Sequence, residues 1–321
     1  MPSIFNPNRP DRQTLRLGAA LITVYLVWGT TYFALDVAMQ TLPPVLMNGA
    51  RFVLAGVLML VIARWQGQAW PSAAQWRASA LIGGLMAFAA MALVVLAQQA
   101  GIGSGLMATV VTTMPMWLAL WTRWGGERVP LTSWVGLVLG AAGALLLALE
   151  GDFSTTLAGT LCAFGAPLAW SLGSYASRRL TLPAPAMASG AQWLLGGLLG
   201  LGVAWLWEPG ARAVAWSEVS LASGLAWLYL VVMGTMVTLN AYLWLLKNTT
   251  AALAGSYSFV NPVVALCVGV LLGGERLTGW VFVAMPLIGL ALALILYGRE
   301  AMQLARSLWP SRQPGSVTGA R

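Results

Sequence analysis

The sequence predicts an all-α integral membrane protein with ten transmembrane helices, arranged as two inverted five-helix repeats. Two observations lead to this prediction. Hydrophobic residues make up 59% of the 321 residues and charged residues only 8%, whereas a soluble domain carries roughly 25% charged residues. The tetrapeptide Gly-Gly-Glu-Arg also occurs twice, at 125–128 and 273–276, with apolar stretches before and after each. This recurrence indicates a duplicated membrane unit.

Other segments of the two halves match in the same order, at an offset of about 141 to 148 residues. The matching pairs are Trp28-Gly29 with Trp170-Ser171, Leu42-Pro43 with Leu182-Pro183, 49–56 with 190–197, and Met114-Pro115 with Asn261-Pro262. A single match has little weight in a chain so rich in Gly and Leu. A series in one order indicates that the halves are copies of each other.

The first predicted repeat covers residues 17–149 and contains five helices. A helix needs about 20 apolar residues to cross the hydrocarbon core of a bilayer, and the segments are delimited by charges and by Pro, Gly and Ser turns. In order, they are 17–39 after Arg16, 44–64 after Pro43, 78–98 after Arg77, 103–122 before Arg123, and 131–149 between Pro130 and Glu150.

The second predicted repeat covers residues 157–297 and contains five helices of the same kind. In order, they are 157–177 before Arg178, 188–207 before Glu208, 221–246 between Ser220 and Lys247, 250–272 before the second Gly-Gly-Glu-Arg turn, and 277–297 between Arg276 and Arg299. Residues 1–16 are predicted to be a cytoplasmic N-terminal segment, and residues 298–321 a cytoplasmic, disordered tail. The first apolar stretch, of about 23 residues, is expected to stay as an anchor rather than be cleaved.

The distribution of basic residues predicts the orientation in the inner membrane. With a cytoplasmic N-terminus, the cytoplasmic segments hold 14 of the 17 basic residues; Arg212 and Arg276 lie outside and Arg51 lies within the second helix. The positive-inside rule then places both termini in the cytoplasm. Because each half has five helices, the second half is inverted. The net charge of +8 is explained by this topology and by anionic lipid, so no nucleic-acid partner is expected.

Composition also argues against several chemical functions. The chain has no histidine, which excludes a Ser-His-Asp triad. The single lysine, Lys247, precedes Asn248, so no phosphate-binding loop is present and ATP-driven transport is not expected. Cys162 and Cys267 lie within predicted helices and suggest neither a zinc site nor a disulfide. We therefore expect no enzyme activity, cofactor or metal.

The first helix of each half carries a tryptophan near its middle. Trp28 and Trp170 occupy equivalent positions, and at this depth an indole N–H needs a partner. Tyr32 and Ser174 lie one turn further on the same helical faces. These residues either line a central pathway or serve helix packing. Asp36, on the same face, is expected at a solvated helix end.

The fourth and ninth helices carry polar residues next to a proline. Thr109, Thr112 and Thr113 precede Pro115, and Ser256, Tyr257, Ser258 and Asn261 precede Pro262. A proline inside a membrane helix frees a backbone carbonyl, so Pro115 and Pro262 are predicted hinges. The alternative is that the Ser and Thr hydroxyls bond to their own helix. Arg51, inside the second helix, is expected to reach outward to the interface, or else to bind a carboxylate.

These motifs resemble the EamA-type drug/metabolite transporter superfamily over about residues 17–297. The resemblance rests on the motifs Trp28-Gly29-Thr30, Leu42-Pro43-Pro44, Arg51-Phe52, both Gly-Gly-Glu-Arg turns, and Gly255-Ser256-Tyr257 leading to Asn261-Pro262. It implies two inverted five-helix repeats and a cavity lined by the first, third, fourth, sixth, eighth and ninth helices. The chain is similar to amino-acid exporters, including the aromatic amino-acid exporter group, which carry tryptophans where this chain has Trp28 and Trp170. Some also have Trp-Pro in the fourth helix where this chain has Met114-Pro115, which favours a more permissive cavity.

The resulting hypothesis is an inner-membrane exporter of amino acids and related metabolites, working by facilitative alternating access. The indoles and Met114 would contact the apolar part of the substrate, while Thr112, Tyr257 and Asn261 would meet its ammonium and carboxylate. A small-molecule substrate and the lipid bilayer are the expected partners, and a monomer is the simpler state. The alternatives are an exporter of drugs or other small metabolites coupled to protons and, from another class, a non-transporting scaffold or scramblase-like protein.

Overall fold

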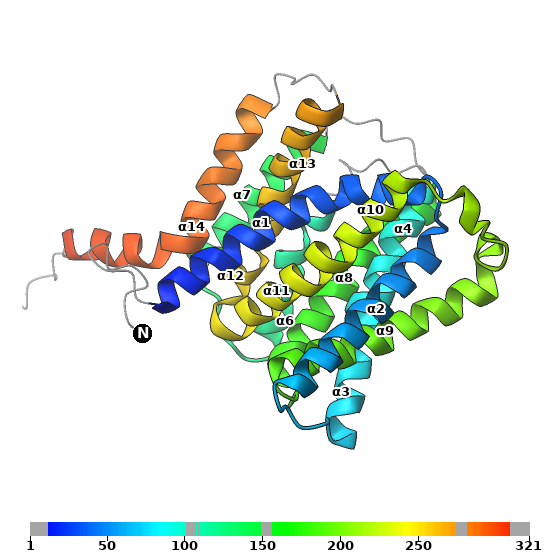
Figure 1. Ribbon diagram of the computed structural model, residues 1–321. Coiled ribbons are helices and arrows are strands. Elements are labelled where there is room, and N and C mark those ends of the chain that lie inside the picture. The colour runs from blue at the N-terminus through cyan, green and yellow to red at the C-terminus, as the bar shows by residue number, and fades with distance from the viewer. Residues whose placement is uncertain (1–11, 101–106, 108–109, 149–155, 274–280, 309–321) are drawn as a thin grey trace, which may run out of the picture.

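The computed structural model describes residues 12–100, 107, 110–148, 156–273 and 281–308, and their regular structure is entirely helical (Figure 1). The first repeat contains α1 (Arg12–Met39), α2 (Pro44–Trp65), α3 (Ala73–Gly83), η1 (Gly84–Ala90), α4 (Met91–Gln99), α6 (Met114–Trp124) and α7 (Leu131–Ala148). The second contains α8 (Leu157–Arg179), α9 (Pro185–Trp207), η2 (Pro209–Arg212), η3 (Trp216–Glu218), α10 (Leu221–Tyr229), η4 (Leu230–Val237), α11 (Thr238–Asn248), α12 (Ala251–Gly255), α13 (Tyr257–Gly273) and α14 (Val281–Leu308).

The described helices have the length and composition of membrane spans. Six helical stretches are long and apolar enough to cross a bilayer: α1, α2, α8, α9 and the continuous stretches Ala73–Gln99 and Leu221–Asn248. Shorter apolar helices in the described part of the chain are Leu131–Gly143, Ala251–Ala265 and Phe282–Ile295. The predicted all-α membrane fold with two inverted repeats is confirmed.

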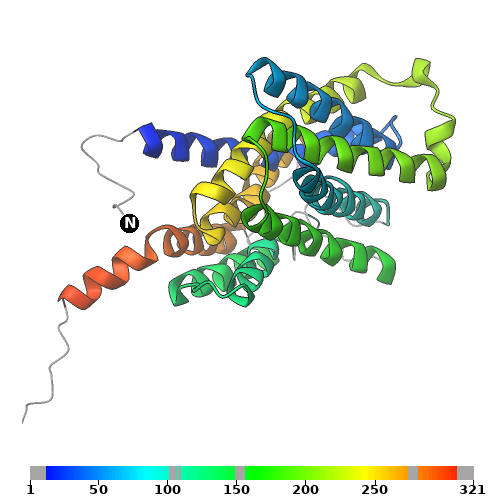
Figure 2. The same cartoon turned by 90° about the horizontal axis from the view of Figure 1, so that it is seen from below.

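The helices of the two repeats pack in equivalent pairs. The second helices, α2 and α9, run along each other, as do the fifth helices, α7 and α14. These two pairs lie at opposite ends of the bundle (Figures 1 and 2). The first helix of each repeat packs against the third and fourth helices of the other: α1 contacts α10, α11 and α13, and α8 contacts α4, η1 and α6. The centre of the protein is therefore built from both repeats.

Glycines allow the close approach of α2 and α9. A Cβ atom on Gly49 would lie 2.7 Å from the backbone nitrogen of Leu201, and one on Gly197 would lie 2.5 Å from that of Val53. Gly56 and Gly190 approach the opposite helix backbone in the same way. Small residues at such crossings permit tight packing where lipid provides no hydrophobic driving force.

The third helix of each repeat contains a π-helical segment, a feature the sequence did not predict. In the first repeat η1 separates α3 from α4, and in the second η4 separates α10 from α11. Within η4 the Thr235 hydroxyl donates to the carbonyl of Leu230 at 2.9 Å, and the Thr238 hydroxyl just beyond it donates to that of Met233 at 2.7 Å. Such segments are frequent at functional sites.

Several predicted boundaries change. The third helix begins at Ala73, because Ser72 and Gln75 form a capping box there. The fourth helix is interrupted by a turn at Thr112 and Thr113 before α6 begins. The ninth predicted helix is divided at Ser256 into α12 and α13.

The predicted disordered tail is helical over its first part. Helix α14 continues to Leu308 rather than ending at 297, and its last turns project beyond the bundle (Figures 1 and 2). Residues 298–308 are rich in Ala, Leu, Met, Gln, Glu and Arg, which are strong helix formers. Thr109, most of the second Gly-Gly-Glu-Arg turn and residues 309–321 lie outside the described residues.

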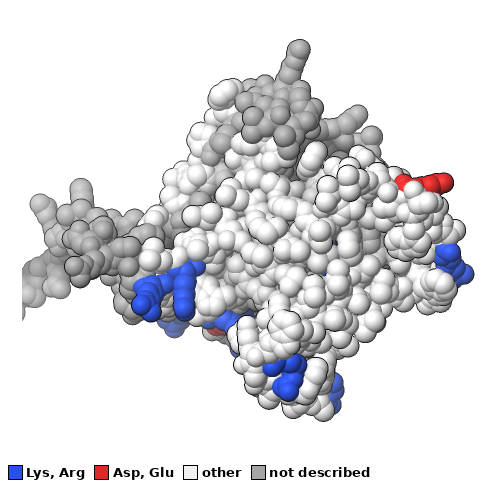
Figure 3. Space-filling view, viewed as in Figure 1, with Lys and Arg blue, Asp and Glu red and all other residues white. Residues whose placement is uncertain are grey.

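The visible face in Figure 3 is mostly uncharged, with Lys and Arg below the bundle, near the start of α1 and at the right edge, and acidic side chains at the upper right. We call the end of the bundle that holds the start of α1 and the turns 66–72, 125–130 and 180–184 the N-terminal face. The end that holds the turn 40–43 and the segment 208–220 is the opposite face. The uncharged belt between them is what a bilayer requires.

Candidate functional site

Four aromatic side chains meet where the first helices of the two repeats cross the centre of the bundle. The rings of Trp28 and Trp170 pack edge to face with centroids 5.4 Å apart. Tyr242 of α11 lies 5.1 Å from Trp28 and 6.0 Å from Trp170, and Tyr257 of α13 lies 4.6 Å from Trp28. The structure thus brings together both predicted tryptophans and Tyr257. We call these four residues the aromatic cluster.

The π-helical segment η4 positions Trp28 and Arg51. The indole Nε1 of Trp28 donates to the carbonyl of Gly234 at 3.0 Å, and Nε of Arg51 donates to the Thr235 hydroxyl at 2.6 Å. A Cβ atom on Gly234 would lie 3.2 Å from Nη2 of Arg51, so the missing side chain makes room for the guanidinium. A helix of regular α geometry would offer these groups in a different register.

A cavity with an empty volume of about 680 Å³ adjoins the aromatic cluster. Its walls come from α1, α2, η1, α4, α6, α8, α11 and α13 and from the residue before the Thr112 turn. The resemblance implied all of these helices except the second, which contributes Arg51 and Phe52. The other lining residues that the sequence did not single out are Thr31, Leu35, Ala90, Met91, Val94, Val111, Ala166, Pro167 and Leu239.

Six of the eight predicted site residues line this cavity. They are Trp28, Tyr32, Met114, Trp170, Tyr257 and Asn261. Ser174 lies outside the lining. Its hydroxyl donates to the backbone carbonyl of Trp170 at 2.8 Å and lies 2.8 Å from the hydroxyl of Tyr242. Thr112 is buried in the turn before α6 and also lies outside the lining. Ser174 thus bonds to two residues of the aromatic cluster, and direct contact of Ser174 and Thr112 with a substrate stays a prediction.

Asn261 and the two predicted hinge prolines take different local roles. With its NH2 group facing them, Asn261 donates to the backbone carbonyls of Tyr25 at 3.3 Å and Tyr257 at 3.1 Å. Pro115 lies in the first turn of α6, where it removes no helical hydrogen bond. Pro262 lies inside α13, as does Pro167 inside α8. A helix-interior proline frees a carbonyl, so Pro262 fits the predicted hinge better than Pro115.

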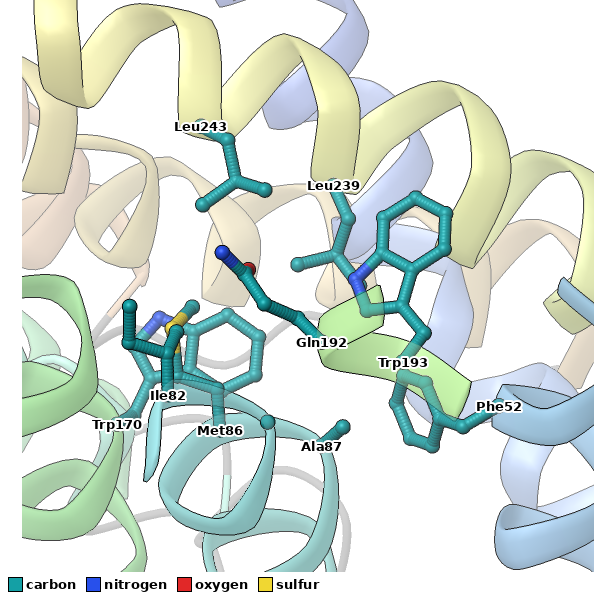
Figure 4. A pocket seen from close by; sticks show the side chains of 10 residues that line it. Phe52, Ile82, Met86, Ala87, Trp170, Gln192, Trp193, Leu239 and Leu243 are labelled. Carbon is teal, nitrogen blue, oxygen red and sulfur yellow. The ribbon is translucent and has the colours of Figure 1, made fainter. Parts of the chain in front are cut away.

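A smaller pocket lies on the other side of Trp170, between η1, α9 and α11 (Figure 4). Gln192 of α9 extends into it between Leu243 and Met86 (Figure 4). Gln192 is the repeat equivalent of Arg51, since 190–197 matches 49–56. Among the described residues, Nε2 of Gln192 has no hydrogen-bond partner. In each repeat, a buried side-chain donor from the second helix therefore lines a pocket together with the central tryptophan: Arg51 with Trp28, and Gln192 with Trp170.

Polar contacts close the bundle between the aromatic cluster and the N-terminal face. The hydroxyls of Tyr25 and Ser256 lie 2.7 Å apart. At the surface, Glu127 of the first Gly-Gly-Glu-Arg turn lies 3.2 Å from Arg179 and 3.7 Å from Arg178 at the end of α8. Arg178 also donates to the carbonyls of Leu246 at 2.6 Å and Thr249 at 3.0 Å. The two repeats are therefore tied together at this face.

The cavity lies on the other side of the cluster, toward the opposite face. Tyr32 and Leu35 follow Trp28 along α1 in that direction, and Ala166 and Pro167 precede Trp170 on the antiparallel α8. The cavity and the closing polar contacts therefore lie on opposite sides of the aromatic cluster, an asymmetry that an alternating-access transporter requires.

Sequence reasoning missed Tyr242, and for Arg51 it favoured the membrane interface over the alternative of binding a carboxylate. Tyr242 lies near Trp244 and Lys247, where an interfacial aromatic is expected, yet it is fully buried in the aromatic cluster. Arg51 was expected to snorkel to the interface, but it is only 4% exposed and lines the cavity. The signal for Arg51 was its distance from the helix end together with its polar equivalent Gln192.

A helical bundle of two inverted membrane repeats with a central cavity at their junction defines the protein as a membrane transporter. The sequence matches the EamA-like transporter family twice, over residues 17–149 and 157–297. The chain belongs to this family.

Similar proteins agree with this assignment. The chain is 34% identical to the "Uncharacterized inner membrane transporter YedA" of Escherichia coli K12, over 90% of this chain and 93% of that protein. It is 27% identical to the "Probable amino-acid metabolite efflux pump" of the same organism, over 88% of this chain and 95% of that one. A protein of known crystal structure, 22% identical, shares the fold with a TM-score of 0.70 over 91% of this chain and 98% of its own.

Proposed function

We propose that the protein exports amino acids and related metabolites across the inner membrane by facilitative alternating access. The observation that carries the proposal is the cavity at the junction of the repeats, whose walls combine large apolar surfaces with a few polar groups. Sites for small molecules have this composition, because apolar walls supply affinity and a few polar groups orient the ligand. The relative named as a probable amino-acid metabolite efflux pump supports the same substrate class.

The side chains suit a zwitterion with an apolar side chain. Phe52, Met91 and Met114 offer apolar contacts, and methionine adapts to side chains of different shape. The faces of Trp28 and Tyr257 can attract an ammonium group, and the carbonyl oxygen of Asn261 can accept a hydrogen bond from it. A zwitterion bound in this way leaves few polar groups unpaired inside the membrane.

Flux of labelled amino acids into proteoliposomes containing the pure protein tests the proposal, with and without an imposed pH gradient. We expect uptake without a gradient, highest for apolar and aromatic side chains. Trp170→Ala should reduce that uptake at least tenfold, because it removes a wall of the cavity. Trp205→Ala, at a position 58% exposed on α9, is the control and should transport like the parent.

Two results would contradict the proposal. Uptake that requires a pH gradient would replace facilitative export by proton-coupled transport. Absence of uptake for every amino acid in both conditions would overturn the substrate class and favour drugs, other metabolites or a function without transport.

A further inference from the structure

Arg51 is a cation held inside the membrane-spanning part of the bundle. It lies one to two turns inside α2, is 4% exposed and lines the cavity. Burying an unpaired charge is strongly unfavourable, and a charged side chain at this depth is by default interpreted as part of a substrate or ion pathway. A purely structural residue at this position would be expected to be apolar or paired.

The partners of Arg51 leave its charge uncompensated. Its Nε donates to the neutral Thr235 hydroxyl, and its Cζ lies 5.0 Å from the ring centroid of the adjacent Phe52. Its Nη1 has no hydrogen-bond partner, and no ion pair joins it to any acidic residue of the described part of the chain. The guanidinium is thus fixed in direction by one neutral contact while part of its donor fork is unused.

We propose that Arg51 binds the carboxylate of the transported substrate, which makes it the specificity-determining residue of the cavity. A guanidinium presents planar N–H donors that match the two oxygens of a carboxylate. The hydrogen bond from Nε to the Thr235 hydroxyl fixes the direction of the guanidinium, and the missing side chain of Gly234 leaves room for it. The guanidinium is therefore preoriented to bind a carboxylate. This inference rests on the proposed function and assigns the substrate class: molecules with a carboxylate, zwitterionic or anionic, and not lipophilic cations.

Competition in the flux assay tests the assignment. The labelled substrate is the amino acid that the panel ranks first, and the competitors are its deaminated acid and its decarboxylated amine, which are 3-phenylpropionate and phenethylamine for phenylalanine. In the parent protein the acid should inhibit at a roughly 10- to 100-fold lower concentration than the amine, as expected for a charge-assisted hydrogen bond in a dry site. Arg51→Gln should abolish most of this preference.

Two further variants separate recognition from structural support. The preference is a ratio of two inhibition constants measured on one preparation, so loss of folded protein leaves it unchanged. Arg51→Lys keeps the charge but loses the planar fork and should retain part of the preference; it also serves if Arg51→Gln cannot be purified. Arg212→Gln, which removes an exposed arginine near the opposite face, should keep the parent ratio.

The outcomes distinguish this inference from the proposed function. If amino acids are transported and Arg51→Gln keeps the acid-over-amine preference of the parent, Arg51 does not bind the carboxylate and the inference alone is overturned. If no amino acid is transported by the parent, both are overturned. A loss of the preference in Arg51→Gln with retention in Arg212→Gln supports both.

Discussion

At the scale of single residues, the repeat equivalents Trp28 and Trp170 make different hydrogen bonds. The Trp28 indole donates to the backbone carbonyl of Gly234, whereas the polar neighbours of the Trp170 indole N–H are the side-chain hydroxyls of Tyr242 and Tyr257. Replacing either by Phe removes the same ring volume and the same N–H group. Only Trp28→Phe also leaves a buried carbonyl without its donor, so we expect it to lower the free energy of unfolding by about 1–3 kcal/mol more than Trp170→Phe does.

Thermal unfolding of the two purified variants in one detergent measures this difference. The comparison is internal, because the loss of packing is common to both variants. Equal melting temperatures would show that the bond from Trp28 to η4 contributes little. A lower temperature for Trp170→Phe would indicate that the Trp170 N–H has a partner that matters more.

The candidate site could be predicted in part from single residues. Trp28 and Trp170 were identified because duplication repeats a central tryptophan, and that signal is visible in one sequence. Tyr242 carried no such signal, since a tyrosine near a helix end normally faces the interface. Arg51 was misjudged because snorkelling depends on which side of the helix faces lipid, and that is decided by the packing of α2 on α9.

At the scale of helices, apolar length and turn residues predicted the spans and most of their ends. They did not predict η1 and η4, because a π-helical segment depends on tertiary hydrogen bonds such as those of Thr235 rather than on local propensity. The division between α12 and α13 at Ser256 escaped prediction for the same reason. The π-helical segments and the break at Ser256 lie in helices that line the cavity or hold the aromatic cluster. Local sequence rules are expected to fail at such functional positions.

The crossing of α2 and α9 gives a prediction at this scale. Gly197→Val places a branched side chain against the α2 backbone near Val53, where even a Cβ atom would approach to 2.5 Å. Because the obstacle is backbone, the helices must separate, and we expect a loss of about 1–3 kcal/mol or more. Gly202→Val, on the same helix with nothing within 4 Å of its Cβ position, is the matched control.

Both glycine variants change helix propensity in the same way, so that contribution cancels in the comparison. Thermal unfolding and the yield of monodisperse protein in detergent are the measurements. Similar losses in the two variants would mean that the α2–α9 contact tolerates separation, and that glycine is not required there.

At the scale of the whole molecule, the two faces of the bundle are held by different polar contacts. The N-terminal face is tied by Glu127 with Arg178 and Arg179. Near the opposite face, Glu208 accepts from the backbone nitrogens of Val45 at 3.0 Å and Leu46 at 2.8 Å, at the start of α2. In an inverted repeat, contacts that close one face favour the arrangement that is open at the other.

Glu127→Gln should therefore shift the protein toward the arrangement that is open at the N-terminal face. The two pairs are partly exposed and share one carboxylate, so together they contribute about 0.4–1 kcal/mol, and the expected change in population is roughly two- to fivefold. The reporter is Ser177→Cys, a buried position on α8 beside Arg178, in a background in which Cys162 and Cys267 are replaced by Ala. Its rate of reaction with a maleimide should rise two- to fivefold in Glu127→Gln.

Glu208→Gln removes the same charge near the other face and should not raise that rate, because its contacts hold α2 and not the end of α8. An equal rise in both variants would attribute the effect to general loosening, and no rise in either would show that Glu127 does not hold the N-terminal face closed.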